Sequence, residues 1–79
     1  MSRDELRAQL QAWLSAARGA EVPALEDSVR FAALGVTSLE AASVLSRVRT
    51  GLKVKLYPRE LRGIDTVGAW LDLVSARLP

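Results

Sequence analysis

The stretch LGVTSLE at residues 34–40 contains the start of a helix together with the turn that leads into it. Gly35 can adopt the left-handed backbone conformation that a tight turn needs. Thr37, followed three residues later by Glu40, forms a capping box in which each side chain accepts a hydrogen bond from the other residue's backbone N–H. Apolar residues then recur every three or four positions up to Leu52. This pattern predicts a helix over residues 38–50, with Gly51 as a left-handed stop.

A second capping box begins the chain, at Ser2 and Glu5. The apolar spacing after it predicts a helix from about Arg3 to Arg18 that ends at Gly19. Residues 19–36 then form a connection of unusual length for a compact domain. Its apolar residues are irregularly spaced, which indicates a loop attached to the core at several points, and a short helical turn fits residues 28–34.

Residues 52–56 alternate apolar side chains with lysines, but no partner strand exists in the sequence, so we expect an extended loop. Pro58 can begin a short helix through Arg62 that Gly63 ends. Asp65 or Thr66 then caps a last helix, whose apolar face includes Val67, Trp70, Leu71 and Val74. Gly68 weakens this helix by about 1 kcal/mol relative to Ala, so packing must stabilise it. The sequence therefore predicts an all-α fold, a small four-helix bundle with three main helices, one short helix and a long first loop.

Length and composition exclude several classes of protein. Seventy-nine residues, 49% hydrophobic and 25% charged, are enough for one folded domain spanning residues 1–79. No apolar run approaches a membrane span and no signal peptide is visible, so we expect a cytoplasmic protein without a membrane partner. The chain contains no His and no Cys, which excludes catalytic triads, the usual zinc sites and disulfides. We expect no enzymatic activity, and any thiol must come from outside the chain.

The charge of +2 is unevenly distributed: residues 1–39 carry four basic and five acidic side chains, and residues 40–79 carry seven and four. A basic half can indicate nucleic-acid binding. However, Arg47, Arg49, Lys53 and Lys55 form no dense run, and no recognition set of Arg, Asn and Gln lines one helical face. A solvated surface is the favoured interpretation, and nucleic acid is not an expected partner.

Ser38 is the first residue of the predicted second helix, where free backbone N–H groups point outward. An anion attached to its hydroxyl would be stabilised by those donors and by the helix dipole. Taken alone, a serine at this position is usually structural.

The stretch LGVTSLE resembles the Leu-Gly-x-Asp-Ser-Leu signature of acyl and peptidyl carrier proteins, in which the serine bears 4′-phosphopantetheine. Phe31 is similar to the aromatic residue that leads into this motif in polyketide synthase carriers. The Gly51-Leu52 helix end and residues 64–67 also match the family's second and fourth helices. The resemblance implies that a phosphopantetheinyl transferase attaches the group from coenzyme A to Ser38, and that acyl or aminoacyl groups are carried on it as thioesters.

Two departures from the family concern recognition. Thr37 replaces the usual Asp, which contacts the transferase, and a neutral side chain cannot supply that charge. Carriers of fatty-acid synthesis resemble one another in an acidic second helix. The predicted second helix here instead contains one acidic residue, Glu40, and two basic residues, Arg47 and Arg49. Since charge complementarity selects partners, the resemblance implies polyketide or mixed polyketide–peptide biosynthesis.

The partner-recognition candidates are therefore Thr37, Leu39, Glu40, Ala42, Arg47 and Arg49. Leu39 and Ala42 would supply apolar contact. The alternative for both is an ordinary helix face, which explains Ala42 equally well. The implied protein is a monomer, and the initial Met favours a stand-alone carrier. Its partners would be the transferase, an acyl- or aminoacyl-loading enzyme, and downstream synthase, transferase or tailoring enzymes. Two alternatives stay open: an unmodified carrier-like interaction module, which Thr37 favours, and a small basic helical DNA-binding domain.

Overall fold

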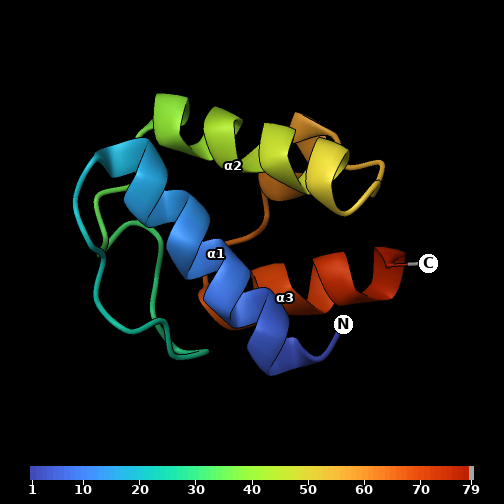
Figure 1. Cartoon of the computed structure of the whole chain (residues 1–79), viewed down its shortest axis with the longest axis horizontal. Coiled ribbons are helices and arrows are strands. Elements are labelled where there is room, and N and C mark those ends of the chain that lie inside the picture. Colours follow the sequence, from blue (N-terminus) through green and yellow to red (C-terminus); the bar gives the residue numbers. More distant parts are fainter. Residues whose placement is uncertain (79) are drawn as a thin grey trace.

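The computed structural model describes residues 1–78 and contains three α-helices: α1 (Arg3–Arg18), α2 (Ser38–Gly51) and α3 (Val67–Arg77). In Figure 1, α2 crosses the top of the view, α3 extends to the lower right, α1 runs diagonally from upper left to lower centre, and the long connection between α1 and α2 loops around the left. α1 packs against both other helices. No strand occurs in the described residues, and one isolated bridge joins Arg30 to Thr66. The predicted helical fold and long first loop are confirmed.

Side chains cap the N-terminus of each helix, as the sequence predicts. Ser2 and Glu5 form the predicted capping box of α1. Thr66, rather than Asp65, caps α3 by accepting a hydrogen bond from Ala69 N at 3.2 Å. At the end of α1, Gly19 has φ 74° and donates its N–H to Ser15 O at 2.9 Å. These local signals set the helix bounds because each cap satisfies backbone groups that the helix leaves unpaired.

Two predictions after α2 need correction. Gly51 is not the left-handed stop: it is the last residue of α2, and Leu52 still donates its N–H to Val48 O at 3.1 Å. The positive φ occurs at Lys53 instead, at 55°. The helix extends because half-buried Leu52 packs against the core. The predicted short helix after Pro58 is a 3-10 turn, Pro58–Leu61, so a fourth α-helix is not confirmed.

The core draws apolar side chains from every part of the chain, and no polar or charged residue is buried among residues 1–78. The helices contribute Leu6, Leu10, Leu14, Val44, Val48, Val67, Trp70, Leu71 and Val74. The loops contribute Val22, Leu25, Val54 and Leu56. The predicted extended loop at 52–56 is confirmed, since its apolar residues face the core while Lys53 and Lys55 are exposed.

The long loop is packed against the start of α3 by backbone hydrogen bonds. Phe31 N donates to Asp65 O at 2.9 Å, and Val67 N donates to Val29 O at 2.9 Å. A hydrogen-bonded turn follows, in which Leu34 N donates to the carbonyls of Arg30 and Phe31. The prediction of a packed loop is confirmed, and a helical turn is present, but at residues 31–35 rather than 28–34, because residues 29–31 bond to residues 65–67 instead. This packing holds the segment that leads directly into α2.

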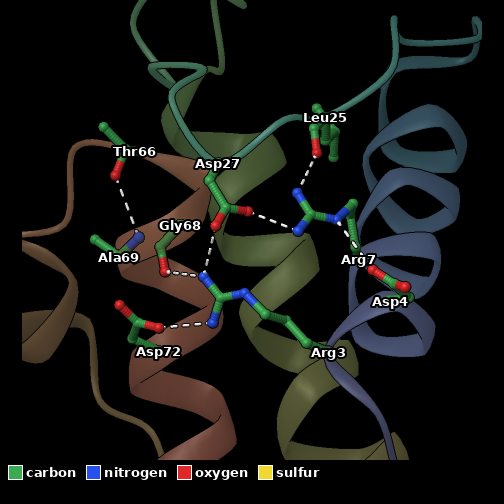
Figure 2. A network of polar contacts seen from close by, with 9 residues as sticks. All are labelled: Arg3, Asp4, Arg7, Leu25, Asp27, Thr66, Gly68, Ala69 and Asp72. Carbon is green, nitrogen blue, oxygen red and sulfur yellow. Dashed lines mark hydrogen bonds and ion pairs between the residues drawn. The ribbon is translucent and has the colours of Figure 1, made fainter.

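A polar network joins the start of α1 to the loop and to α3 (Figure 2). Arg3 binds Asp72 at 2.6 Å and Asp27 at 3.0 Å, and Arg7 binds the other Asp27 oxygen at 2.6 Å. Arg7, followed by Arg3, lowers the pKa of the Asp27 carboxyl. Gly68 lies against this loop: its N–H donates to Asp27 O at 2.9 Å, and an added Cβ would lie 3.1 Å from that oxygen. A larger residue at this position would therefore require the loop to move away by a few tenths of an ångström.

Candidate functional site

Ser38 lies at the point where the packed loop turns into α2. Gly35 has φ 66°, which reverses the chain, and Thr37 Oγ1 accepts a hydrogen bond from Glu40 N at 3.1 Å. Ser38 is therefore fixed as the first residue of the helix. Its side chain is exposed, and its hydroxyl has no hydrogen-bond partner within residues 1–78. The hydroxyl is positioned by the backbone yet free to react with a group from solvent.

The backbone around this hydroxyl favours an anion. The N–H groups of Glu40 and Ala41 are bonded to Thr37, at 3.1 and 2.9 Å. Those of Ser38 and Leu39 have no acceptor in the part of the chain that the structure describes. Unpaired N–H groups at a helix N-terminus, together with the helix dipole, stabilise a phosphate. The donor set at Ser38 therefore fits a phosphodiester on its hydroxyl.

Glu40 holds the start of α2 against α1. One carboxylate oxygen accepts the Thr37 N–H at 2.9 Å, and the other accepts Arg18 Nε at 2.9 Å. The Arg18 guanidinium, followed by the Thr37 N–H, lowers the pKa of Glu40 from 4.5 to about 2. The Glu40 side chain is only 11% exposed. This carboxylate, a candidate for partner recognition, is thus already occupied by contacts within the chain.

An apolar cavity of about 220 Å³ lies beside Ser38, between the helices and the loop turn. Val36 and Ala41, which flank Ser38 in the chain, form part of its lining. Leu10, Leu14 and Trp70 line it from α1 and α3. Because every residue of the lining is apolar, the cavity favours an apolar group over a polar one.

The remaining candidates for partner contact lie on the outer surface of α2. Leu39 is 82% exposed, and Ala42, Arg47 and Arg49 are also exposed. At 3.6 residues per turn, Arg49 lies on the same side of the helix as Ser38, whereas Arg47 lies almost opposite Arg49. The structure therefore brings Ser38, Ala42 and Arg49 together along one side and separates Arg47 from them. Their roles as partner contacts stay predictions.

Sequence reasoning missed three features of this site. Arg18 was predicted only as the last residue of the first helix, but it pairs with Glu40, 22 residues away. The cavity beside Ser38 had no separate signal, because its lining follows the ordinary apolar pattern of the core. Lys53 and Lys55 join Arg49 at a groove beside α2. The sequence did contain a signal for the lysines: each is flanked by apolar residues that face the core, which indicates that the lysine side chains lie on the surface.

No group of three or more carboxylate, His or Cys side chains within residues 1–78 is arranged to hold a metal ion. None of the helices in this range combines the length and apolar character that crossing a membrane requires.

Comparison with known proteins gives one match. A family model described as the phosphopantetheine attachment site matches residues 5–74, which includes all of α2 and most of α1 and α3. No curated protein and no solved structure matched the chain.

Proposed function

Because the chain belongs to the phosphopantetheine attachment site family, we propose that Ser38 is the residue that carries its covalent 4′-phosphopantetheine group. Domains of this family are non-catalytic tethers, and the covalent group is their cofactor. When bound, the group supplies a thiol, which this chain lacks, and that thiol carries acyl or aminoacyl groups as thioesters.

The observation that carries the assignment is the free, exposed hydroxyl of Ser38 beside two unpaired backbone N–H groups. These N–H groups would bind the phosphate oxygens and stabilise the negative charge. Thr37 and Glu40 fix the turn on which Ser38 lies, and Arg18 holds that turn against α1. The chain's own contribution is thus to present one hydroxyl in a defined position and to bind the anion formed there.

The apolar cavity gives this carrier a second role toward its cargo. Val36 and Ala41 place the cavity next to Ser38, and its lining would bind the hydrocarbon part of an acyl group and exclude water from it. Burial of apolar area stabilises by about 25 cal/mol per Å². Since a bound group stabilises only the folded state, an octanoyl thioester should raise the melting temperature above that of the acetyl thioester. Equal melting temperatures for the two would show that the cargo stays outside the cavity.

The carrier's pathway is proposed to be polyketide or mixed polyketide–peptide biosynthesis. Support comes from the resemblance of the 31–40 segment and from the scarcity of acidic side chains on α2, where Glu40 is the only carboxylate. Carrier domains in general interact with a phosphopantetheinyl transferase and with loading and processing enzymes. A single domain over residues 1–79, a monomeric state and a cytoplasmic location stay predictions of the sequence.

The test uses a fluorescent coenzyme A analogue and a phosphopantetheinyl transferase of broad specificity. Wild-type protein should become labelled, and Ser38→Ala should not. Ser75→Ala is the matched control, since Ser75 is an exposed serine on another helix, and it should label like the wild type. If several transferases fail to label the wild type, the unmodified interaction module becomes the better interpretation.

A further inference from the structure

The Lys and Arg side chains that form no ion pair in the described chain all lie in one segment. Five of the eleven basic side chains form ion pairs with carboxylates: Arg3, Arg7, Arg18, Arg30 and Arg77. The other six form no ion pair within residues 1–78, and all lie between positions 47 and 62: Arg47, Arg49, Lys53, Lys55, Arg59 and Arg62. The only carboxylate in that segment, Glu60, is bonded to Arg77. The segment is therefore a source of positive potential that the chain itself does not neutralise.

Half of these free cations gather at one groove. The α2 groove, an open volume of about 570 Å³, runs between α2 and residues 53–55. Ala42, Leu45 and Ser46 line it from α2, and Arg49, Lys53 and Lys55 supply its charge. No carboxylate is part of its lining. The groove thus combines three unpaired positive charges with aliphatic surface.

The α2 groove lies on the side of α2 that carries Ser38. Ser38 and Ala42 are one turn apart, and Arg49 is about three turns, or about 16 Å, from Ser38 along the same side. Lys53 adopts φ 55°, a left-handed conformation that is uncommon for a lysine. The chain therefore leaves the direction of α2 at the groove. A molecule bound in the groove would therefore lie next to the group attached at Ser38.

We propose that the α2 groove docks a partner protein through an acidic, partly apolar segment. Carboxylates of that segment would pair with Arg49, Lys53 and Lys55, and its aliphatic side chains would contact Ala42 and Leu45. The identification of the partner as an enzyme that acts on the group carried at Ser38 rests on the proposed function. The binding of an acidic segment in the groove does not depend on that function.

Two observations favour a protein segment over nucleic acid. The groove is lined in part by aliphatic carbon, whereas a phosphate backbone offers nothing apolar to bind there. The other free cations are also dispersed: Arg47 lies on nearly the opposite side of α2 from Arg49, and Arg59 lies over the Tyr57 ring at 5.2 Å. These other charges therefore do not continue the three groove charges into a row along which a nucleic-acid strand could bind.

The test is an NMR titration of the ¹⁵N-labelled protein with a short capped peptide of Glu, Leu and Ala in a helical amphipathic pattern. We expect saturable shifts that map to residues 42–55 and an affinity that falls as salt is added. The triple variant Arg49→Gln, Lys53→Gln, Lys55→Gln should bind about tenfold more weakly, because each exposed charge pair contributes modestly. Arg62→Gln, which removes an unpaired charge outside the groove, should bind like the wild type.

Each other outcome overturns the proposal. Shifts that map away from the groove, equal binding by the triple variant, or equal binding of a peptide with Lys in place of Glu would each contradict it. Absence of binding at low salt would do the same, as would tighter binding of a short DNA duplex, which would favour nucleic acid. The titration is repeated on Ser38→Ala, which should bind the peptide like the wild type. Docking is thus measured without the attached group, and the Ser38 assignment is measured separately by the labelling experiment.

Discussion

Replacement of Thr37 by Ala tests how firmly the site is held by its cap. Thr37 Oγ1 accepts a hydrogen bond from Glu40 N at 3.1 Å, and the side chain is exposed, so truncation removes this bond without opening a cavity. The second bond of the capping box, from the backbone N–H of residue 37 to the Glu40 carboxylate, does not involve the Thr37 side chain and is kept. Loss of an N-cap costs about 1 kcal/mol, within a range of about 0.5–2 kcal/mol.

For a domain of this size, about 1 kcal/mol lowers the melting temperature by about 4–8 °C. Thermal unfolding followed by circular dichroism measures it. Thr50→Ala is the matched control: its hydroxyl also makes a hydrogen bond, to Ser46 O at 2.9 Å, but inside the last turns of α2. There alanine has the higher helix propensity, so the melting temperature should stay equal or rise slightly.

A third variant, Thr37→Asp, tests whether stability depends on having an N-cap at position 37 or on threonine itself. Aspartate caps at least as well as threonine, and its charge interacts favourably with the helix N-terminus, so stability should stay within about 0.5 kcal/mol of wild type. The reasoning is refuted if Thr37→Ala is as stable as wild type, or if Thr37→Ala and Thr50→Ala lose the same stability.

Three further predictions concern the contacts that support the site. Because the folded-state pKa of Glu40 is lowered from 4.5 to about 2, its contacts stabilise the fold above about pH 4.5 and cease to do so as the pH falls toward 2; the melting-temperature difference between wild type and Glu40→Gln should shrink over that window, and a constant difference would contradict the assignment. Leu71→Ala, at a fully buried core position, should lower the free energy of unfolding by about 2–5 kcal/mol in a denaturant titration, whereas Leu39→Ala should change it by less than about 0.5 kcal/mol; similar losses in both would contradict the core described above. Gly68→Ala should destabilise the fold, because overpacking against the loop backbone costs about 1–3 kcal/mol and outweighs a helix-propensity gain of about 1 kcal/mol. The control Gly63→Ala, at a position with open space around it, should stabilise by about 0.4–1 kcal/mol. If Gly68→Ala is more stable than the wild type, the loop can move away and the prediction is wrong.

The helices could be predicted from the sequence because their signals are local. Each capping box lies within four residues, as at Thr37 and Glu40, and the apolar stripe of each helix repeats within one or two turns. The end of α2 was predicted wrongly because a glycine is a signal for a stop but not a cause of one. Leu52 continues the helical hydrogen bonding to Val48 and packs on the core, so the left-handed residue occurs later, at Lys53.

Contacts between distant residues could not be predicted in the same way. The pair of Arg18 and Glu40 depends on the way α1 crosses α2, and nothing in either segment specifies its partner. The sequence indicates that Gly68 costs helix stability, but only the fold places Asp27 against it. Ser38 was predicted as the attachment residue from its motif, and the structure adds that its hydroxyl is exposed and its neighbouring N–H groups are unpaired within residues 1–78.

The most direct measurement of the central assignment is fragmentation mass spectrometry of the protein after reaction with coenzyme A and a phosphopantetheinyl transferase. We expect an intact-mass increase of one phosphopantetheine group, with every modified fragment containing Ser38. A modified fragment that lacks Ser38, or an unchanged intact mass with several transferases, would contradict the assignment.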